Sequence, residues 1–379
     1  MAEQVHKYPF PWSSAVTQPR ELARLHDEPV VRVTLPSGDT AQLITRYNDI
    51  RAVLTDPRVS KNRNRPDVAR MTEKKVKVFQ NQVNMDPPAH PRMRRLIAKE
   101  FTPARVTKLR PRIQRITDDL LDEMARCRPP ADIAQSLAFP LSIQVICELL
   151  GVPPADRAHF TDTSAPPWDY MRDLIARKRR EPADDLVSGL IQVHDEDDGR
   201  LSSAELLWWC TVLLLAGYET TANQLCSAVV LLLAHPDQLS LLREDYTRMP
   251  LAVEELLRCQ VVGTSLSMLR YVTEDIEIAG RTIARGTSVI TALESANHDP
   301  AAFSCPADMD ITRSCPQQLT FSLGRHFCAG ASLARAELQI GLESLLRRFP
   351  TMRLATPLSD LRRHDDAFTQ GFVAVPVEW

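Results

Sequence analysis

The chain has 379 residues, 44 % of them hydrophobic and 25 % charged, and its 46 basic and 48 acidic side chains leave a formal charge of −2. This is the composition of a soluble globular protein with a large core, and the balanced charge argues against nucleic acid or an anionic membrane as the main partner. Glycine is scarce, with 12 residues against 28 prolines, and none lies between Gly38 and Gly151. Such a stretch favours helices joined at prolines.

The predicted fold is mainly α, with small β-sheets near both ends. Two apolar runs at 29–35 and 41–45 flank a turn with Gly38 and predict a hairpin in a β-rich portion at about 28–60. Helical patterns cover 86–150 and 168–193. The longest periodic segment, 203–234, predicts one long helix that is capped by Ser203 and stopped by Pro236. A second strand-rich portion spans 270–293, and the tail after Pro350 also has a strand pattern.

The eight cysteines include no CxxC pair, and five of them lie in apolar, helix-like stretches. This pattern argues against a disulfide framework and favours a reduced, cytoplasmic setting. The N-terminus lacks the pattern of a signal peptide, and the longest apolar run, 206–218, is too short to span a bilayer. We therefore expect a cytoplasmic protein without a membrane segment.

One cysteine has a distinctive setting, in the loop Phe321-Ser-Leu-Gly-Arg-His-Phe-Cys328-Ala-Gly330. A cysteine in a tight turn before a helix N-terminus gains thiolate character, which suits a soft-metal ligand or a nucleophile. A lone cysteine is more often only a small buried side chain. No local histidine identifies the base of a cysteine hydrolase. A rival zinc site, with spacings unlike those of structural zinc sites, would use Cys305, Cys315, Cys328 and either His298 or His326.

The loop resembles the haem-binding signature of the cytochrome P450 haem-thiolate monooxygenases, in their soluble bacterial form. Three further motifs occur in that family's order over nearly the whole chain. The resemblance implies the cytochrome P450 fold as a single domain over residues 1–379, with a long central helix over the haem. It makes Cys328 the axial ligand of the haem iron, where thiolate donation favours O–O cleavage. Ser322 departs from the signature, because the family usually has glycine there.

The second motif is Ala216-Gly-Tyr-Glu-Thr-Thr221, in the middle of the long helix. Gly217 costs the helix roughly 1 kcal/mol against alanine and would let a ligand approach the backbone. The resemblance assigns Glu219 and Thr220 as the acid–alcohol pair that relays protons during dioxygen activation. Tyr218 is a less usual residue there and is expected to line the pocket or the relay.

The third motif is Glu255-Leu-Leu-Arg258, which the resemblance makes a buried ion pair that supports the cysteine loop. The family usually adds a basic partner from a downstream segment. Asp308 occupies that position here, so we expect the Glu255–Arg258 pair without its usual third member.

The fourth motif supplies partners for the two haem carboxylates. His90 and Arg94 stand at i and i+4 on one helix face, and arginine binds carboxylates in bidentate fashion. The set of haem-contacting residues that the resemblance implies is His90, Arg94, Gly217, Arg270, Phe321, Gly324, His326, Cys328 and Gly330.

The resemblance also places a substrate pocket, whose predicted lining is Trp209, Leu213, Ala216, Val262, Leu266, Met268, Phe368 and Gln370. The interval 156–184 is short for the two lid helices of the family. Either the lid is truncated or a segment is missing, and we favour the second because an open haem would admit water.

The sequence thus predicts a haem-thiolate monooxygenase that hydroxylates or epoxidises a small organic molecule, as in secondary metabolism. It would use haem b (iron protoporphyrin IX) and electrons from NAD(P)H through a ferredoxin reductase and a ferredoxin, and act as a monomer. The same haem could instead couple or cyclise its substrate without oxygen insertion. A more remote alternative is a haem sensor or scaffold without turnover. A basic docking face for an acidic ferredoxin is predicted from Arg92, Arg95, Lys99, Arg325 and Arg335.

Overall fold

The computed structural model describes residues 6–62, 65–71, 85–160, 167–196, 201–262, 268–314, 317–364 and 370–379, the side chains of 158 and 159 excepted. The chain divides into two compact units. Unit 1 comprises residues 1–90, 230–328 and 362–371, and unit 2 comprises residues 91–229, 329–361 and 372–379. A single domain over the whole chain stays a prediction.

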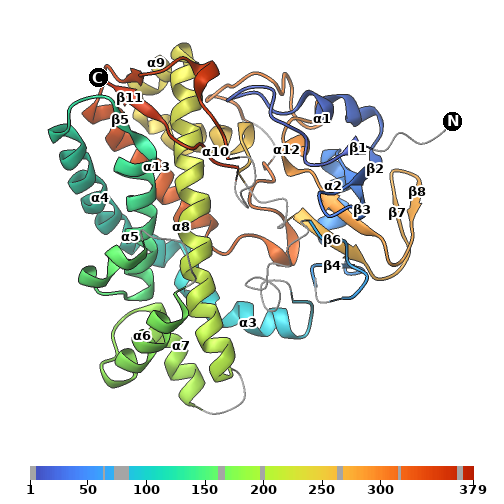
Figure 1. Ribbon diagram of the computed structural model, residues 1–379, viewed down its shortest axis with the longest axis horizontal. Coiled ribbons are helices and arrows are strands. Elements are labelled where there is room, and N and C mark those ends of the chain that lie inside the picture. The colour runs from blue at the N-terminus through green and yellow to red at the C-terminus, as the bar shows by residue number, and fades with distance from the viewer. Residues whose placement is uncertain are drawn as a thin grey trace. The chain divides into compact units, whose positions relative to one another are not determined.

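Unit 1 is built on a six-stranded sheet with the strand order β1-β2-β3-β9-β6-β4 (Figure 1). β2 and β3 form the predicted hairpin, with Val31 opposite Leu43 and Gly38 in the turn at a φ of 84°. β3 also pairs in parallel with β9, so that Leu43 lies beside Ile290. One sheet therefore joins the two predicted strand-rich portions. Its strands are β1 (His6–Lys7), β2 (Val30–Thr34), β3 (Thr40–Ile44), β4 (Val59–Ser60), β6 (Leu269–Val272) and β9 (Ser288–Thr291).

Short helices and a ribbon complete unit 1. The α-helices are α1 (Arg20–Arg24), α2 (Tyr47–Thr55), α9 (Pro236–Glu244), α10 (Met249–Cys259) and α12 (Leu293–Ala296). The ribbon pairs β7 (Ile276–Ile278) with β8 (Arg281–Ile283). Helix α2 buries Ile50, Val53 and Leu54, which share one face at helical spacing. These side chains join those of the sheet in one apolar core.

Unit 2 is mostly helical. Its helices are α3 (Ala89–Ala98, whose first two residues belong to unit 1), α4 (Pro103–Arg126), α5 (Phe139–Leu150), α6 (Trp168–Arg180), α7 (Leu186–Asp195), most of α8 (Ser203–Ala234) and α13 (Ala331–Arg348). Thr102 caps α4 by accepting a hydrogen bond from Arg105 N, and α4 packs against α5 and α13. The tail contributes β10 (Arg353–Leu354) and β11 (Pro376–Glu378), which form a small sheet with β5 (Ala131–Asp132).

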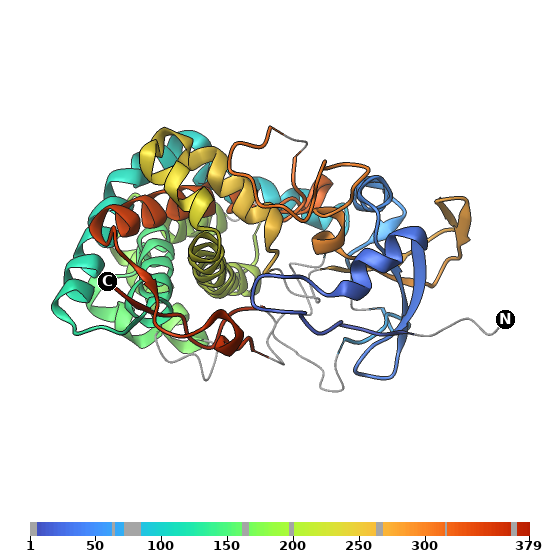
Figure 2. The same cartoon turned by 90° about the horizontal axis from the view of Figure 1, so that it is seen from above.

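Helix α8 confirms the predicted long helix, and at 1.5 Å per residue it is about 48 Å long. A capping box opens it: Ser202 Oγ accepts from Glu205 N at 3.3 Å, and Glu205 Oε2 accepts from Ser202 N at 2.9 Å. The cap is therefore Ser202, one residue before the predicted Ser203. Within unit 2, α5 and α13 lie beside α8 in both views (Figures 1 and 2), and Gly341 of α13 faces side chains of the other two helices.

Among the described residues, no single helix is long and apolar enough to cross a membrane. Helices α8 and α9 taken together are long and apolar enough by length and composition alone, but a bend of 102° separates them. The predicted lid interval, residues 156–184, contains most of a 3-10 helix at Pro154–Phe160 and all of helix α6, and it ends just before α7. Residues 161–166 of that interval lie outside the described residues, and the two explanations for its length stay predictions.

Candidate haem site

Backbone hydrogen bonds close the cysteine loop upon itself. Cys328 N donates to Phe321 O at 2.9 Å, and Phe327 N donates to Gly324 O at 3.0 Å, so the loop turns back just before α13 begins. Gly324 has a φ of 71°, and a Cβ there would lie 2.7 Å from Leu54 O. Only glycine suits this position, because both its backbone angle and the approach of α2 exclude a side chain.

Ser322 follows the backbone path of a glycine. Its φ is 63°, in the left-handed region that costs an L-residue about 1–2 kcal/mol. Its N donates to Leu319 O at 2.7 Å, and its Oγ is buried with no hydrogen-bond partner in the described part of the chain. Gly330, the N-cap of α13, has an ordinary φ of −83°, and a Cβ there would only touch Phe101 at 4.0 Å. The strained position of this loop is thus Ser322.

Positively charged groups of unit 1 gather around His326, two residues before Cys328. The rings of His90 and His326 lie 4.3 Å apart, centroid to centroid. Burial lowers the pKa of His326 to about 2, so its imidazole is neutral at physiological pH. After burial, the groups that lower this pKa are Lys61, His90, Arg270 and Arg325. Burial also lowers the pKa of Arg270 to about 10, which still leaves it cationic.

This donor set fits haem b. His326 Nε2 is buried without a hydrogen-bond partner among the described residues, so the site holds an unmet polar group. The haem carries two carboxylates, which neighbouring cations and imidazoles stabilise. Cys328 would hold the iron, while His90, Arg270 and His326 would hold the carboxylates. Arg94 lies four residues after His90 on the same face of α3, as predicted.

After its exposed first turn, helix α8 is buried along most of its length, but one face is partly accessible between residues 213 and 220. Leu213, Ala216 and Thr220 share one face there, at i, i+3 and i+7. Thr220 Oγ1 donates to Ala216 O at 3.1 Å, and Glu219 beside it is half-buried. The structure therefore brings the predicted alcohol onto the same face as two predicted pocket residues.

Trp209 lies one turn before Leu213 and is buried. Its ring packs edge-to-face on Trp208, with 5.2 Å between the centroids. The indole Nε1 has no hydrogen-bond partner in the described ranges.

Gly217 and Tyr218 face helix α5 of unit 2. A Cβ on Gly217 would lie 2.7 Å from Cδ1 and Cγ1 of Ile146, so a neighbouring helix already requires glycine at this position. The contact of Gly217 with a haem stays a prediction. Tyr218 is buried and packs edge-on against Phe139 at 6.5 Å, and burial raises the pKa of its hydroxyl to about 12. It is thus a packing residue that keeps its proton at neutral pH.

Glu255 and Arg258 form the predicted pair on α10. Two hydrogen bonds of 2.8 Å join them, from Nε to Oε2 and from Nη2 to Oε1, and their side chains are 2 % and 1 % exposed. Burial raises the pKa of Glu255, but the hydrogen bonds and charges around it outweigh burial and leave the pKa below its usual value. The remaining donors of Arg258 bind the carbonyl oxygens of Asn297, Pro306 and Asp308.

The third basic partner, expected to be missing, is Arg313. Its Nε lies 3.2 Å from Glu255 Oε1, and it also donates to Asp308 O at 2.8 Å. Asp308 offers its backbone carbonyl to both arginines while its side chain is exposed. The arginine five residues after Asp308, in the same irregular segment, is the sequence signal that points to this partner.

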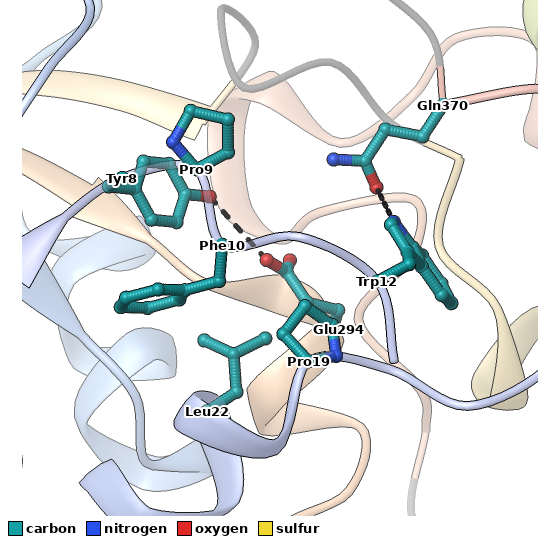
Figure 3. A pocket seen from close by; sticks show the side chains of 8 residues that line it. All are labelled: Tyr8, Pro9, Phe10, Trp12, Pro19, Leu22, Glu294 and Gln370. Carbon is teal, nitrogen blue, oxygen red and sulfur yellow. Dashed lines mark hydrogen bonds between the residues drawn. The ribbon is translucent and has the colours of Figure 1, made fainter. Parts of the chain in front are cut away.

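Other predicted pocket residues have mixed outcomes. Val262 and Met268 are buried, and Met268 belongs to the apolar core of unit 1. Gln370 accepts a hydrogen bond from Trp12 Nε1 at 3.0 Å, so its side chain faces the N-terminal segment (Figure 3). Leu266 and Phe368 lie outside the described residues.

None of the seven described cysteines forms a disulfide. Cys127, Cys305 and Cys328 are exposed, whereas burial raises the thiol pKa of the other four, to about 12 for three of them: Cys147, Cys210 and Cys259. The fourth, buried in α8, is Cys226. The described residues contain no group of three or more His, Cys, Asp or Glu side chains that could hold a metal ion, so the zinc hypothesis gains no support there.

Comparisons with known proteins agree with the motifs. A sequence model of the family described as Cytochrome P450 matches residues 149–370. The chain is 39 % identical over 373 residues to nocardicin C N-oxygenase of Nocardia uniformis subsp. tsuyamanensis, covering 93 % of each protein. It is 40 % identical over 392 residues to mycinamicin IV hydroxylase/epoxidase of Micromonospora griseorubida, covering 98 % of each. The solved structure of the putative thioether synthase SgvP, involved in the tailoring step of griseoviridin, matches with a TM-score of 0.92 at 39 % identity, covering 99 % of this chain and 100 % of that one.

The chain therefore belongs to the cytochrome P450 family. The predicted fold class is confirmed, and so is the predicted enzyme class, a monooxygenase that acts on small molecules. Membership of the family implies a haem iron.

Proposed function

We propose that this protein is a haem-thiolate monooxygenase that hydroxylates or epoxidises an intermediate of secondary metabolism. The observation that carries the proposal is the cysteine loop, which closes upon itself next to a cluster of positive charges. These cations of unit 1 surround His326, which stands two residues before Cys328 in the sequence. The names of the two curated relatives, an N-oxygenase and a hydroxylase/epoxidase, support oxygen insertion into such molecules.

The cofactor is haem b, and its thiolate-bound iron supplies the capacity to activate dioxygen. The Cys328 thiolate is the iron ligand. Arg270 and His326 orient the group by its carboxylates, together with His90 and Arg94. Phe321, Gly324 and Gly330 shape the loop, in which the amide of Cys328 is already bound to Phe321 O and so fixes the path of the backbone at the sulfur.

Glu219 and Thr220 handle protons on α8. The Thr220 hydroxyl is held by Ala216 O at 3.1 Å, an arrangement that leaves its lone pairs available to accept a second hydrogen bond. Glu219 precedes it and is half-buried, so it can exchange protons with water. In this proposal the Glu219 carboxyl and the Thr220 hydroxyl are the two groups of α8 that pass protons toward the haem.

Electrons come from NAD(P)H through a reductase and a ferredoxin, and the enzyme works as a cytoplasmic monomer. Of the basic residues predicted for docking, Arg92 is engaged by Glu205, and Arg325 donates to Asp56 O at 3.0 Å. Arg95 and Lys99 are exposed and remain the stronger candidates. Reversing both charges should slow reduction by an acidic ferredoxin and flatten its salt dependence, whereas Arg24→Glu in α1 should change neither.

A second candidate is oxidative coupling or ring formation without oxygen insertion. The similarity to a solved structure described as a putative thioether synthase supports this candidate, because thioether synthesis forms a new carbon–sulfur bond. Product mass separates the two reactions, since only insertion adds an oxygen atom.

The carbon monoxide difference spectrum of the reduced protein tests the proposal. The wild type should show the Soret shift of a thiolate-ligated haem, and Cys328→Ala should lose it. Cys305→Ala, which removes another exposed thiol, should keep it. A wild-type spectrum without that shift would refute the assignment.

A further inference from the structure

Arg363 contacts three parts of unit 1 that are far apart in the sequence. Its Nη1 donates to Gln370 O at 3.0 Å, and its Nη2 donates to Gln260 Oε1 at 2.9 Å and to Ala15 O at 2.7 Å. Its guanidinium carbon lies 3.8 Å from the centroid of the Trp12 ring. One side chain therefore joins the N-terminal segment, the end of α10 and the C-terminal loop.

The residues that Arg363 contacts are also bonded to one another. Gln260 Nε2 donates to Ala15 O at 3.0 Å, and Trp12 Nε1 donates to Gln370 Oε1 at 3.0 Å (Figure 3). The end of α10 thus has one contact with each of the other two segments, and those two segments share three contacts with each other. In such a closed network, loss of one member loosens the rest.

The chemistry of this position calls for arginine. The acceptors at this position are two backbone carbonyl oxygens and one carboxamide oxygen. The planar guanidinium of arginine can donate to all three at once, and its face can stack on the indole of Trp12. Burial lowers the pKa of Arg363 to about 9, so the group remains charged at neutral pH although it has lost much of its hydration. A lysine would offer one ammonium in place of the fork.

The network fixes the end of α10 and the start of the C-terminal segment at Gln370, and both lie at or near predicted pocket residues. Gln260 is fully buried and is the C-cap of α10, two residues before the predicted pocket residue Val262. Gln370 is itself a predicted pocket residue. We propose that Arg363 is a positioning residue for substrate selectivity, which sets the separation of Val262 and Gln370 through Gln260 and the Gln370 carbonyl. This inference rests on the proposed function of the haem site.

Azole ligands test the inference without a known substrate. Imidazole is too small to reach the walls of a P450 pocket, whereas clotrimazole extends far into it, and both shift the Soret band of the holoenzyme when they bind the iron. Arg363→Gln should change the dissociation constant of clotrimazole about three- to tenfold, the effect of about one lost hydrogen bond, and that of imidazole less than about twofold. Arg363→Lys should give a smaller change in the same direction. The matched control is Arg362→Gln, which removes the exposed neighbouring arginine and should change neither constant.

Two further variants keep the test decisive if Arg363→Gln folds poorly. Gln260→Ala and Trp12→Phe remove other members of the network and should shift the same ratio of dissociation constants. Equal changes for both azoles, or none for either in folded variants, would overturn the inference. Failure of the proposed function looks different, because the wild type would then show no azole-induced Soret shift at all.

Discussion

Arg313 Nε lies 3.2 Å from Oε1 of Glu255, and the two side chains are 8 % and 2 % exposed. Burying a carboxylate costs desolvation energy, which its cationic partners offset. When one of two such partners is removed, part of this cost is no longer offset. Arg313→Gln should therefore lower the free energy of unfolding by about 2–3 kcal/mol. This loss is smaller than that expected for a buried carboxylate that loses its only cationic partner. Urea unfolding followed by circular dichroism measures this. Asp308→Ala is the control and should cost under about 0.5 kcal/mol, because only the Asp308 carbonyl is used. A larger effect at Asp308 than at Arg313 would contradict the assignment.

The strained backbone of the cysteine loop predicts a stabilising substitution. Ser322→Gly removes the Cβ penalty at a φ of 63° but gives the unfolded chain more freedom, so the expected net gain is about 0.5–1 kcal/mol. Thermal unfolding and the rate of haem loss both report on it. Ser359→Gly, in an exposed 3-10 turn without a positive φ, should instead destabilise the protein. Loss of stability in Ser322→Gly would show that the serine side chain matters more than the backbone angle.

The contact between Gly217 and Ile146 predicts a rescue. Alanine at 217 gains helix propensity, roughly 1 kcal/mol, but its Cβ overlaps Ile146, at a typical cost of 1–3 kcal/mol. Gly217→Ala should thus be destabilising alone, and much less so in the presence of Ile146→Ala, as a double-mutant cycle of unfolding free energies would reveal. Gly189→Ala in α7 is the matched control, since its Cβ would meet only the flexible end of Lys99, and it should be neutral or stabilising. Additive effects at 217 and 146 would argue against the overlap.

Glu294 predicts a pH-dependent stability. Tyr8 Oη donates to its Oε1 at 3.5 Å, and its Oε2 is buried without a partner among the described residues (Figure 3). Burial raises the pKa of Glu294 to about 7, above its ordinary value of 4.5. The folded state therefore binds the proton more tightly, and this stabilisation, complete below pH 4.5, is lost as the pH rises through 7.

Glu294→Gln should consequently be more stable than the wild type at pH 8, by about 1–3 kcal/mol, and the difference should shrink toward pH 5. Urea unfolding at both pH values is the measurement. Glu274→Gln, at an exposed position, should give the same difference at each pH. A constant difference for Glu294→Gln would mean that this carboxyl does not titrate with folding.

Local patterns predicted the regular elements well. The bounds of α8 match its periodic segment, and the hairpin β2–β3 and the Glu255–Arg258 pair lie within short stretches of sequence. Apolar periodicity, turn residues and i,i+3 spacing depend only on near neighbours in the chain, which explains this agreement.

Contacts between distant residues could not be predicted in the same way. Trp12 and Gln370 are 358 positions apart, and Arg313 reaches Glu255 across 58. Nothing in either local sequence specifies such a partner. The same holds for Gly217, whose role depends on Ile146 of another helix, and for the left-handed backbone of Ser322, which the serine itself disfavours.

The burial of four cysteines bears on resistance to oxidants. Oxidation of cysteine begins from the thiolate, so Cys147, Cys210 and Cys259, whose thiol pKa values are raised to about 12, react slowly at neutral pH. In an enzyme that handles dioxygen, these three buried thiols thereby stay protonated and shielded from solvent. Among the described cysteines other than the proposed iron ligand Cys328, damage should begin at Cys127 and Cys305, on the surface, where an oxidised side chain leaves the packing of the core intact.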